Sequence, residues 1–421
     1  MTAPASRAGG AGRRSSSSRR LSGRRFGVRS ASGERLHLES HPARVRTVRG
    51  RGRIFWQRWL AVALVASLTG CDRSPPAAPQ RVAPELEGGL TWLNSPPLKL
   101  AELRGKVVLV DFFEYSCVNC LRTLPYQKEW QRRYADHGLV IIGVHTPQYG
   151  FSMDPHNVFQ AVKRLGITYP VVVDSNFKIA DAYGNRFWPR KFLIDRRGRI
   201  RFDHTGEGAY VVMERTIQEL LHELHPRIEF PAPMAPLEPT DRDGVVCYPV
   251  TPELYLGQER GRLDNPEATK STDPVMFTAP KQPASDSVYA VGQWANQSEY
   301  LRHTRDTEVY EDFLALNYRA TEVNVVMKPE DVYWMKILVK QDEQPLRREV
   351  AGADVLFDGD GQSYVKVDGA RMYNLVAKQP YGTHELRLYP QTRGLSVYSF
   401  SFGTCEMPAD AKRLQQAQEN K

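Results

Sequence analysis

The chain has 421 residues, 41% of them hydrophobic and 25% charged, which is enough apolar material for more than one folded domain. The formal net charge of +9 comes from the start of the chain: of 57 basic and 48 acidic residues, the first 70 positions hold 15 arginines and two glutamates, leaving 42 basic against 46 acidic residues. The remainder is weakly acidic, so the charge gives no basis for nucleic-acid binding and we exclude that class of partner.

Residues 1–53 predict a disordered tail. The tract is rich in Arg, Ser and Gly and contains no Lys or Asp, so it cannot bury a core. A start codon assigned too far upstream, with true initiation near Val48, is one explanation of its length.

Residues 54–71 resemble a bacterial lipoprotein signal peptide. An apolar run follows the basic tract and is short for a membrane span. It closes on Leu68-Thr-Gly-Cys71, which resembles a lipobox, so we expect cleavage before Cys71 and lipidation of that cysteine. A Pro- and Ala-containing linker is predicted over 72–90. The resemblance implies a lipid-anchored protein of the bacterial cell envelope that faces the periplasm or the exterior.

Residues 91–226 alternate between strand and helix patterns. Strands are predicted over 106–113, 139–144, 171–173, 191–194 and 200–204. Helices are predicted over 121–137, 157–165, 177–183 and 209–224. This order is typical of an α/β domain that ends in a hairpin.

A cysteine pair, Cys117-Val-Asn-Cys120, lies between the first predicted strand and the first predicted helix. Cysteines at positions i and i+3 of a helix start can form a disulfide, and the helix N-terminus stabilises a thiolate on the first one. We therefore expect Cys117 to attack substrate and Cys120, one turn further in, to resolve the product. A plain structural disulfide, or part of a zinc or copper site that includes His145, is the alternative.

The motifs around this pair are similar to those of the thioredoxin family, and in particular of the TlpA/DipZ-like thiol-disulfide oxidoreductases. They are Glu114-Tyr-Ser-Cys-Val-Asn-Cys-Leu-Arg-Thr-Leu-Pro-Tyr126, Gly143-Val-His-Thr-Pro147, Leu165-Gly-Ile-Thr-Tyr-Pro170 and Gly206-Glu-Gly-Ala-Tyr210. The resemblance implies a TlpA-like thioredoxin fold, protein disulfides as substrates, and no cofactor besides the redox-active cysteine pair.

The resemblance also implies roles for residues near the pair. Asp111 lies where thioredoxins keep a buried acid beneath the disulfide, and it would accept or return the Cys120 proton; a buried acid without a kinetic role is the alternative. Pro189 looks like the family's cis-proline, which leaves a backbone edge for a substrate strand. Thioredoxins carry Trp where this chain has Ser116, so we expect substrate contacts from Trp188, Tyr115 and Ser116.

A proline-rich connector over 227–280 precedes a predicted all-β sandwich over 281–405 and a polar tail over 406–421. Strand patterns recur over 288–291, 313–319, 322–327, 332–339, 364–367, 383–389 and 395–402. The order of motifs resembles the jelly-roll, carbohydrate-binding-module-like domain that follows thioredoxin in DipZ proteins. Cys247 and Cys405 flank this domain and are candidates for a structural disulfide, with two free buried thiols as the alternative.

The resemblance implies partners as well. DipZ proteins carry a membrane electron-transfer domain that the printed sequence does not contain, so we expect a separate CcdA/DsbD-like membrane electron donor. A platform of Trp294, Trp334, Tyr300 and Tyr310 is a candidate site for cell-wall glycan, although such aromatics also pack in cores. Two other functions remain open: a glycan-binding lipoprotein with a thioredoxin scaffold, and a disulfide oxidase or isomerase.

Overall fold

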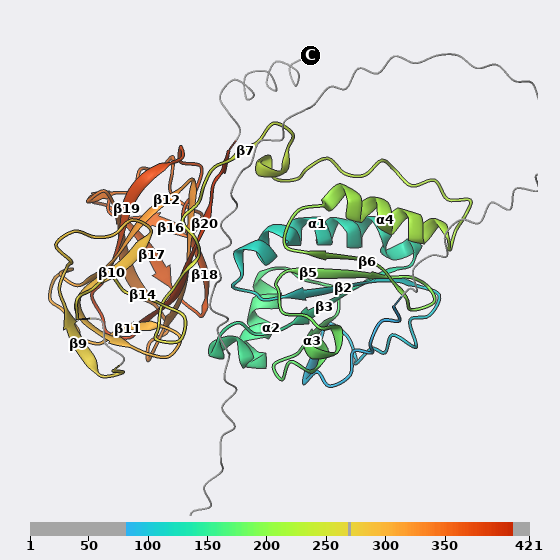
Figure 1. Cartoon of the computed structure of the whole chain (residues 1–421), viewed down its shortest axis with the longest axis horizontal. Helices are drawn as coiled ribbons and strands as arrows, with labels where there is room; N and C mark the ends of the chain where they lie inside the picture. The colour runs from blue at the N-terminus through green and yellow to red at the C-terminus, as the bar shows by residue number, and fades with distance from the viewer. Residues whose placement is uncertain (1–80, 268–270, 407–421) are drawn as a thin grey trace, which may run out of the picture. The chain divides into compact units, whose positions relative to one another are not determined.

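The computed structural model describes residues 81–267 and 271–406, which form an α/β domain and an all-β domain (Figure 1). The predicted tail (1–53), the predicted signal peptide with Cys71, and residues 72–80 of the predicted linker lie outside the described residues, as do residues 407–421. Within the described ranges, no helix is long and apolar enough to cross a membrane.

The first domain has the predicted thioredoxin-like α/β architecture. Its strands are β1 (Thr91–Leu93), β2 (Val107–Phe113), β3 (Leu139–His145), β4 (Val171–Val173), β5 (Arg190–Ile194) and β6 (Ile200–Thr205). Its helices are α1 (Val118–Tyr134), α2 (Pro155–Arg164), α3 (Lys178–Tyr183) and α4 (Tyr210–His222), with short 3-10 turns at Ala135–His137 and Gly150–Met153. The sheet order is β1-β4-β3-β2-β5-β6; β2, β3 and β4 are parallel, and the other neighbours are antiparallel.

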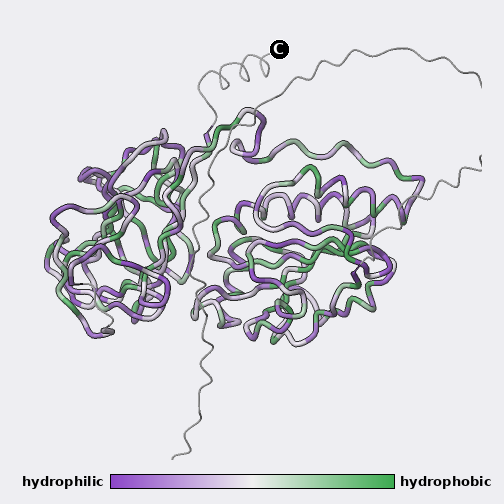
Figure 2. The backbone as a smooth tube through the Cα atoms, in the orientation of Figure 1, coloured by the Kyte–Doolittle hydropathy of each residue, from purple (hydrophilic) through white to green (hydrophobic). Residues whose placement is uncertain are grey.

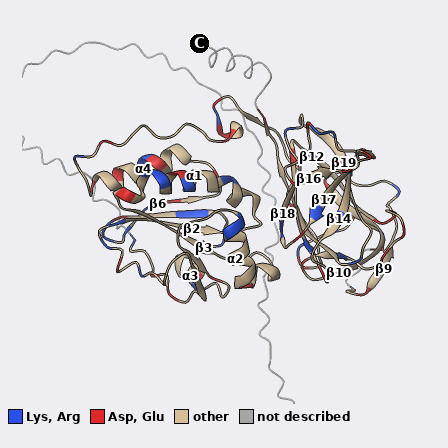
Figure 3. Ribbon diagram, turned by 180° about the vertical axis from the view of Figure 1, so that it is seen from behind, with Lys and Arg blue, Asp and Glu red and all other residues tan. Residues whose placement is uncertain are grey.

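Strand β2 lies at the centre because both of its faces are apolar. All seven of its residues are buried. Leu109 packs in one hydrophobic cluster with Trp130 of α1 and Ile217 of α4, whereas Val110 packs in another with Ile179 of α3. A strand that is covered on both faces has a nearly continuous apolar sequence, and this pattern allowed β2 to be predicted from the sequence. Figure 2 shows the hydrophobic residues along these central strands, and Figure 3 shows charges of both signs on α1 and α4.

Three expectations for this domain need correction. Helix α1 begins at Val118 rather than 121, because Cys117 itself is its N-cap. Strand β1 has no counterpart in the prediction. Residues 81–90 are not a free linker: Ala83 donates its N–H to Gly198 O at 3.0 Å, and Leu86 is only 3% exposed, so this segment packs on the α3 side of the sheet.

The second domain is the predicted β-sandwich. Its two sheets meet in one strand, β10 (Ser287–Asn296), whose first half pairs with β12 (Phe313–Ala320) and whose second half pairs with β9 (Pro274–Phe277) and β11 (Leu301–His303). The change occurs at Gly292, where φ is +94° and a Cβ would lie 2.0 Å from the Asp312 carboxyl. Only glycine fits this crossing.

One sheet continues through β12, β19 (Gly382–Pro390), β14 (Met335–Gln341), β17 (Ser363–Val367) and β16 (Val355–Phe357); the other continues through β11, β20 (Leu395–Gly403), β13 (Glu322–Pro329) and β18 (Arg371–Val376). Alternate residues point into one shared core, such as Leu314, Leu316 and Tyr318 of β12. This alternation is the period of a half-buried strand.

The boundaries of the second domain also need correction. Within the predicted connector, β8 (Leu254–Tyr255) pairs with β20 and β9 pairs with β10, so sandwich strands begin well before residue 281. These segments are too short to show a periodic pattern. Residues 332–334 lie outside β14, and Tyr333 is 97% exposed. Short strands β7 (Val246–Cys247), β15 (Gln344–Pro345) and β21 (Cys405–Glu406) complete the described strands, and Pro239–Asp241 forms a 3-10 turn.

The start of the connector packs back on the first domain. Met234 is buried, and its N–H donates to Glu214 Oε2 at 2.8 Å. The Tyr126 hydroxyl accepts from Leu237 N at 2.8 Å and donates to Asp241 at 2.6 Å, while the Tyr126 ring stacks on Tyr210. The proline-rich segment from Met234 to Asp241 is therefore fixed to the first domain by hydrogen bonds.

Candidate active site

The two cysteines lie at the start of α1, shortly after the carboxyl end of the central strand β2. Cys117 is half-buried and is the N-cap residue, with its Sγ accepting from the Cys120 backbone N–H at 3.4 Å. Cys120 is 4% exposed. Burial, the hydrogen bond with Cys117 and the nearby charge of Cys117 raise the pKa of Cys120 well above its ordinary value of 9.0. The more accessible sulfur, that of Cys117, thus lies at the helix N-terminus, and the buried Cys120 keeps its proton.

Asp111 lies beneath this pair, as predicted, but it has a partner that the sequence reasoning missed. Lys191 of β5 stands directly opposite Asp111 of β2, and its Nζ is 3.3 Å from Asp111 Oδ1. Both side chains are 2% exposed. The charge of Asp111 is among the causes that raise the pKa of Cys120, so the acid lies within electrostatic reach of the buried thiol. Lys191 precedes the apolar residues Phe192-Leu-Ile194 of β5, and a lysine next to such a buried run is the signal that could have indicated a buried acidic partner.

A second buried acid lies immediately before the cysteines. Glu114 is fully buried, and its Oε2 accepts from the Ser116 N–H at 2.8 Å and from the Ser116 hydroxyl at 2.6 Å. Its other oxygen is 3.9 Å from His145 Nε2. The His145 ring stacks on Tyr115 with centroids 5.3 Å apart. These contacts hold the segment that leads into Cys117.

This packing corrects the expected substrate contacts of Tyr115 and Ser116. Tyr115 is 2% exposed and Ser116 is 3% exposed. Ser116 turns its hydroxyl inward to Glu114, and Tyr115 lies against His145, because a buried carboxylate and imidazole attract the nearby polar and aromatic groups. Both residues therefore pack inside the domain, in the segment that precedes Cys117, and do not form an exposed surface for substrate.

The Trp188–Pro189 peptide bond is cis, as predicted. The Pro189 carbonyl accepts from Gly206 N–H at 2.8 Å, and Pro189 itself is buried. Trp188 is half-buried and packs against the same hydrophobic cluster as Cys117. Trp188 and the two cysteines thus contribute to one hydrophobic cluster although they are some seventy positions apart in the chain.

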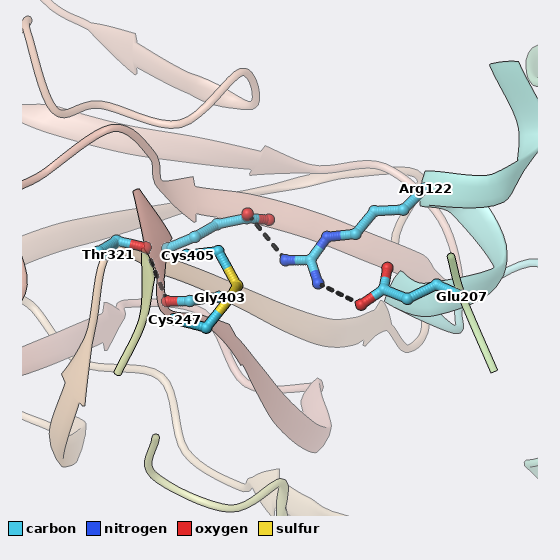
Figure 4. The surroundings of a disulfide bond; sticks show 7 residues. Arg122, Glu207, Cys247, Thr321, Gly403 and Cys405 are labelled. Atoms are coloured by element: carbon cyan, nitrogen blue, oxygen red, sulfur yellow. Dashed lines mark hydrogen bonds and ion pairs between the residues drawn. A yellow bond between two sulfur atoms is a disulfide. The ribbon is translucent and has the colours of Figure 1, made fainter. Parts of the chain in front are cut away.

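The remaining described cysteines form a disulfide between Cys247 and Cys405, opposite each other on β7 and β21. This outcome excludes the alternative of two free thiols. Figure 4 shows Arg122 reaching from α1 toward this disulfide, with a hydrogen bond to Glu207 at 3.4 Å. Arg122 also donates to Glu322 of β13 at 2.9 Å, so one side chain joins the two domains.

Two other sequence hypotheses concern metal and glycan. Among the described residues, no group of three His, Cys, Asp or Glu side chains is placed to hold a metal ion. The proposed aromatic platform is not assembled, because Trp294 is fully buried with its Nε1–H donating to Val291 O, while Trp334 is 53% exposed in a loop. A hollow of about 440 Å³ on the sandwich is lined by polar residues including Asp286, Arg319, Asp342 and His384, and these are already paired with one another.

Comparisons with known proteins agree with this geometry. The Redoxin family pattern matches residues 80–219, and the pattern described as thioredoxin-like C-terminal domain matches residues 251–403. The chain is 34% identical to Protein DipZ of Mycobacterium tuberculosis over 326 residues, which are 76% of this chain and 43% of that protein. It therefore spans less than half the length of the DipZ proteins.

Shorter relatives match the first domain. Thiol-disulfide oxidoreductase YkuV of Bacillus subtilis is 29% identical over 140 residues, covering 33% of this chain and 94% of YkuV. Among solved structures, a thiol-disulfide isomerase from Corynebacterium glutamicum is 29% identical, with a TM-score of 0.30, and the match covers 33% of this chain and 96% of that one.

Proposed function

We propose that this chain, which is similar to the DipZ proteins and to shorter thiol-disulfide oxidoreductases, reduces disulfides of protein substrates through Cys117 and Cys120. The observation that carries the proposal is the contrast between the two sulfurs. Cys117 is half-buried at a helix N-terminus, and Cys120 is buried with a raised pKa. A nucleophile beside a protonated resolving thiol is the arrangement that dithiol exchange requires.

The reaction has two steps. The Cys117 thiolate attacks one sulfur of the substrate disulfide; a Cys117–substrate disulfide forms, and the other substrate sulfur leaves as a thiolate that takes up a proton. Cys120 then loses its proton and attacks the Cys117 sulfur, which releases the second substrate thiol and forms the Cys117–Cys120 disulfide. Two electrons pass from the enzyme to the substrate; one of the two protons that the substrate thiols gain derives from Cys120 and the other from solvent, because Cys117 reacts as a thiolate.

Asp111 is the proposed acceptor of the Cys120 proton in the second step. It is buried on the strand beneath the pair, and its charge already influences Cys120. Lys191 offsets the cost of keeping a carboxylate in this apolar position. Pro189 and Trp188 are the proposed edge along which an extended substrate segment lies.

We further propose that the protein is lipid-anchored in the bacterial cell envelope through Cys71 and receives electrons from a CcdA/DsbD-like membrane donor. The support for the anchor is the basic tract, apolar run and lipobox-like ending of residues 54–71. The support for a donor is chemical: a reductase that ends each cycle as a disulfide needs two electrons before the next one. Labelling with radioactive palmitate in cells, lost in Cys71→Ser, tests the anchor.

The direction of electron flow is tested by the equilibrium reduction potential of the pair, titrated against dithiothreitol. We expect a value near that of thioredoxin, about −270 mV, whereas a value near −120 mV belongs to an enzyme that forms disulfides. Cys117→Ser is the control without a reversible couple. Failure of the wild-type pair to form a disulfide would remove the catalytic function altogether.

A further inference from the structure

The loop between β3 and α2, residues 146–153, begins beside the cysteine pair. The Thr146 N–H donates to Phe113 O at 3.1 Å, and the preceding residue, His145, stacks on Tyr115. A displacement of this loop would therefore act on the segment that carries Cys117. We refer to residues 146–153 as the active-site loop.

The β-sandwich holds the active-site loop by hydrogen bonds. The Tyr149 hydroxyl is 2.7 Å from the Ser399 hydroxyl, and Gly150 N–H donates to Glu299 Oε2 at 2.8 Å. A third bond joins Gln148 Nε2 to the Tyr255 hydroxyl at 3.1 Å. Three consecutive residues of the loop thus bind the second domain.

Aromatic packing reinforces these bonds. The Phe151 ring meets Tyr398 edge-on with centroids 4.8 Å apart, and both side chains are at least nine-tenths buried. The exposed Arg260 places its guanidinium 5.1 Å from the Tyr149 ring centroid and 4.2 Å from that of Tyr255. Side chains from both domains therefore share one hydrophobic cluster.

Tyr255 adds a further aromatic ring of the second domain to this cluster. It is half-buried and packs against the cluster that also receives Cys117 and Trp188. Its hydroxyl donates to Glu253 at 2.7 Å while accepting from Gln148, so both directions of its hydrogen bonding are occupied. Burial chiefly raises the pKa of Tyr255, and Cys117 is among the charges that add to the shift, which places the phenol within electrostatic reach of that sulfur.

We propose that Tyr255 is a specificity-determining residue: the sandwich supplies it, next to the active-site loop, as a wall of the substrate site at Cys117. This proposal rests on dithiol exchange at Cys117. An extended polypeptide on either side of a disulfide lies against this wall and gains contact with the rigid aromatic face. A small disulfide reaches Cys117 without this contact. The second domain thereby favours disulfides carried on polypeptide segments.

The test compares two disulfide probes in single-turnover reactions of the reduced full chain. Insulin presents polypeptide disulfides, and 5,5′-dithiobis(2-nitrobenzoate) presents a small one. In Tyr255→Ala we expect the rate constant with insulin to fall by about fivefold or more, since truncating an aromatic contact residue has effects of this order, and that with the small probe to stay within about twofold. Tyr255→Phe keeps the ring and should stay near wild type on both probes.

Two controls separate this proposal from a folding defect and from failure of the proposed function. Tyr333→Ala removes a 97% exposed tyrosine of the same domain and should change neither rate. Tyr255→Leu retains apolar volume for folding and should show the same selective loss as Tyr255→Ala. If the rate constants for both probes fell equally, or if neither fell, the proposed role of Tyr255 in substrate selection would be wrong. A wild-type protein inert toward both probes would overturn the dithiol chemistry itself.

Discussion

Lys191 and Asp111 face each other across β5 and β2 as a buried ion pair, with Nζ 3.3 Å from Oδ1 and each side chain 2% exposed. Removing two charges from water costs several kcal/mol each, and only their close approach offsets that cost. The pair therefore keeps a charged acid beneath Cys120, in a position where an isolated carboxylate would be strongly disfavoured.

Breaking this pair on one side should destabilise the first domain. In Lys191→Met, Asp111 remains buried without its cation, and we expect the free energy of unfolding to fall by about 3–5 kcal/mol. The double variant Asp111→Asn with Lys191→Met removes both charges and should recover most of the loss. Urea unfolding followed by tryptophan fluorescence measures both effects, and a single variant as stable as wild type would contradict a buried pair.

The two cysteines should give different products when each is replaced. In Cys120→Ser the first step of exchange proceeds but the resolving thiol is missing, so a covalent Cys117–substrate disulfide accumulates. In Cys117→Ser the remaining thiol is buried with a raised pKa, and no such adduct forms. Non-reducing gel electrophoresis followed by mass spectrometry of the adduct distinguishes them. Trapping by Cys117→Ser instead would reverse the assigned roles.

The stability of the dithiol form should depend on alkaline pH through Cys120. The folded chain holds the Cys120 proton above pH 9, where the unfolded chain releases it, so the native state binds more protons and its stability falls as pH rises past about 9. One such proton gives a slope of up to about 1.4 kcal/mol per pH unit. Below pH 9 this contribution is constant.

The oxidised protein is the matched control for this pH dependence, because a Cys117–Cys120 disulfide cannot titrate. Burial also raises the pKa of Tyr134 to about 12, and such tyrosines destabilise both forms at higher pH. The difference between dithiol and disulfide unfolding curves from pH 8 to 10 measures the two cysteines together, and the curve of Cys117→Ser, which keeps Cys120 as the one thiol of the pair, isolates Cys120. Parallel curves over that range would contradict the buried thiol.

The Cys247–Cys405 disulfide should contribute strongly to stability. It joins residues 158 positions apart, and the chain-entropy treatment gives about 5 kcal/mol for a loop of this length as an upper value. The double variant Cys247→Ser with Cys405→Ser should therefore lower the denaturation midpoint of the sandwich while leaving the Cys117–Cys120 couple titratable. Thiol alkylation of the unfolded, unreduced wild type should leave these two cysteines unlabelled.

Much of the first domain was predictable because its signals are local. The apolar run that forms β2, the Cys117/Cys120 spacing and the glycine after Ala135–His137 each identify an element within a few residues. The family motifs then identified the cis bond before Pro189. The sandwich was recognised from its longer strands, whereas β8 and β9, with two and four residues, carry no periodic signal and were assigned to a connector.

By itself, the sequence predicted the two fold classes, a cysteine pair at the start of a helix and the acid on β2, and it offered the Cys247–Cys405 disulfide as one of two alternatives. The tertiary structure alone decided which side chains meet: Lys191 with Asp111, Ser116 turned inward to Glu114, and the active-site loop bound to the sandwich. The reason is physical. Hydrophobic period and capping are properties of neighbouring residues, but a buried charge pair or a shared wall depends on strand register and domain contact, which bring distant positions together.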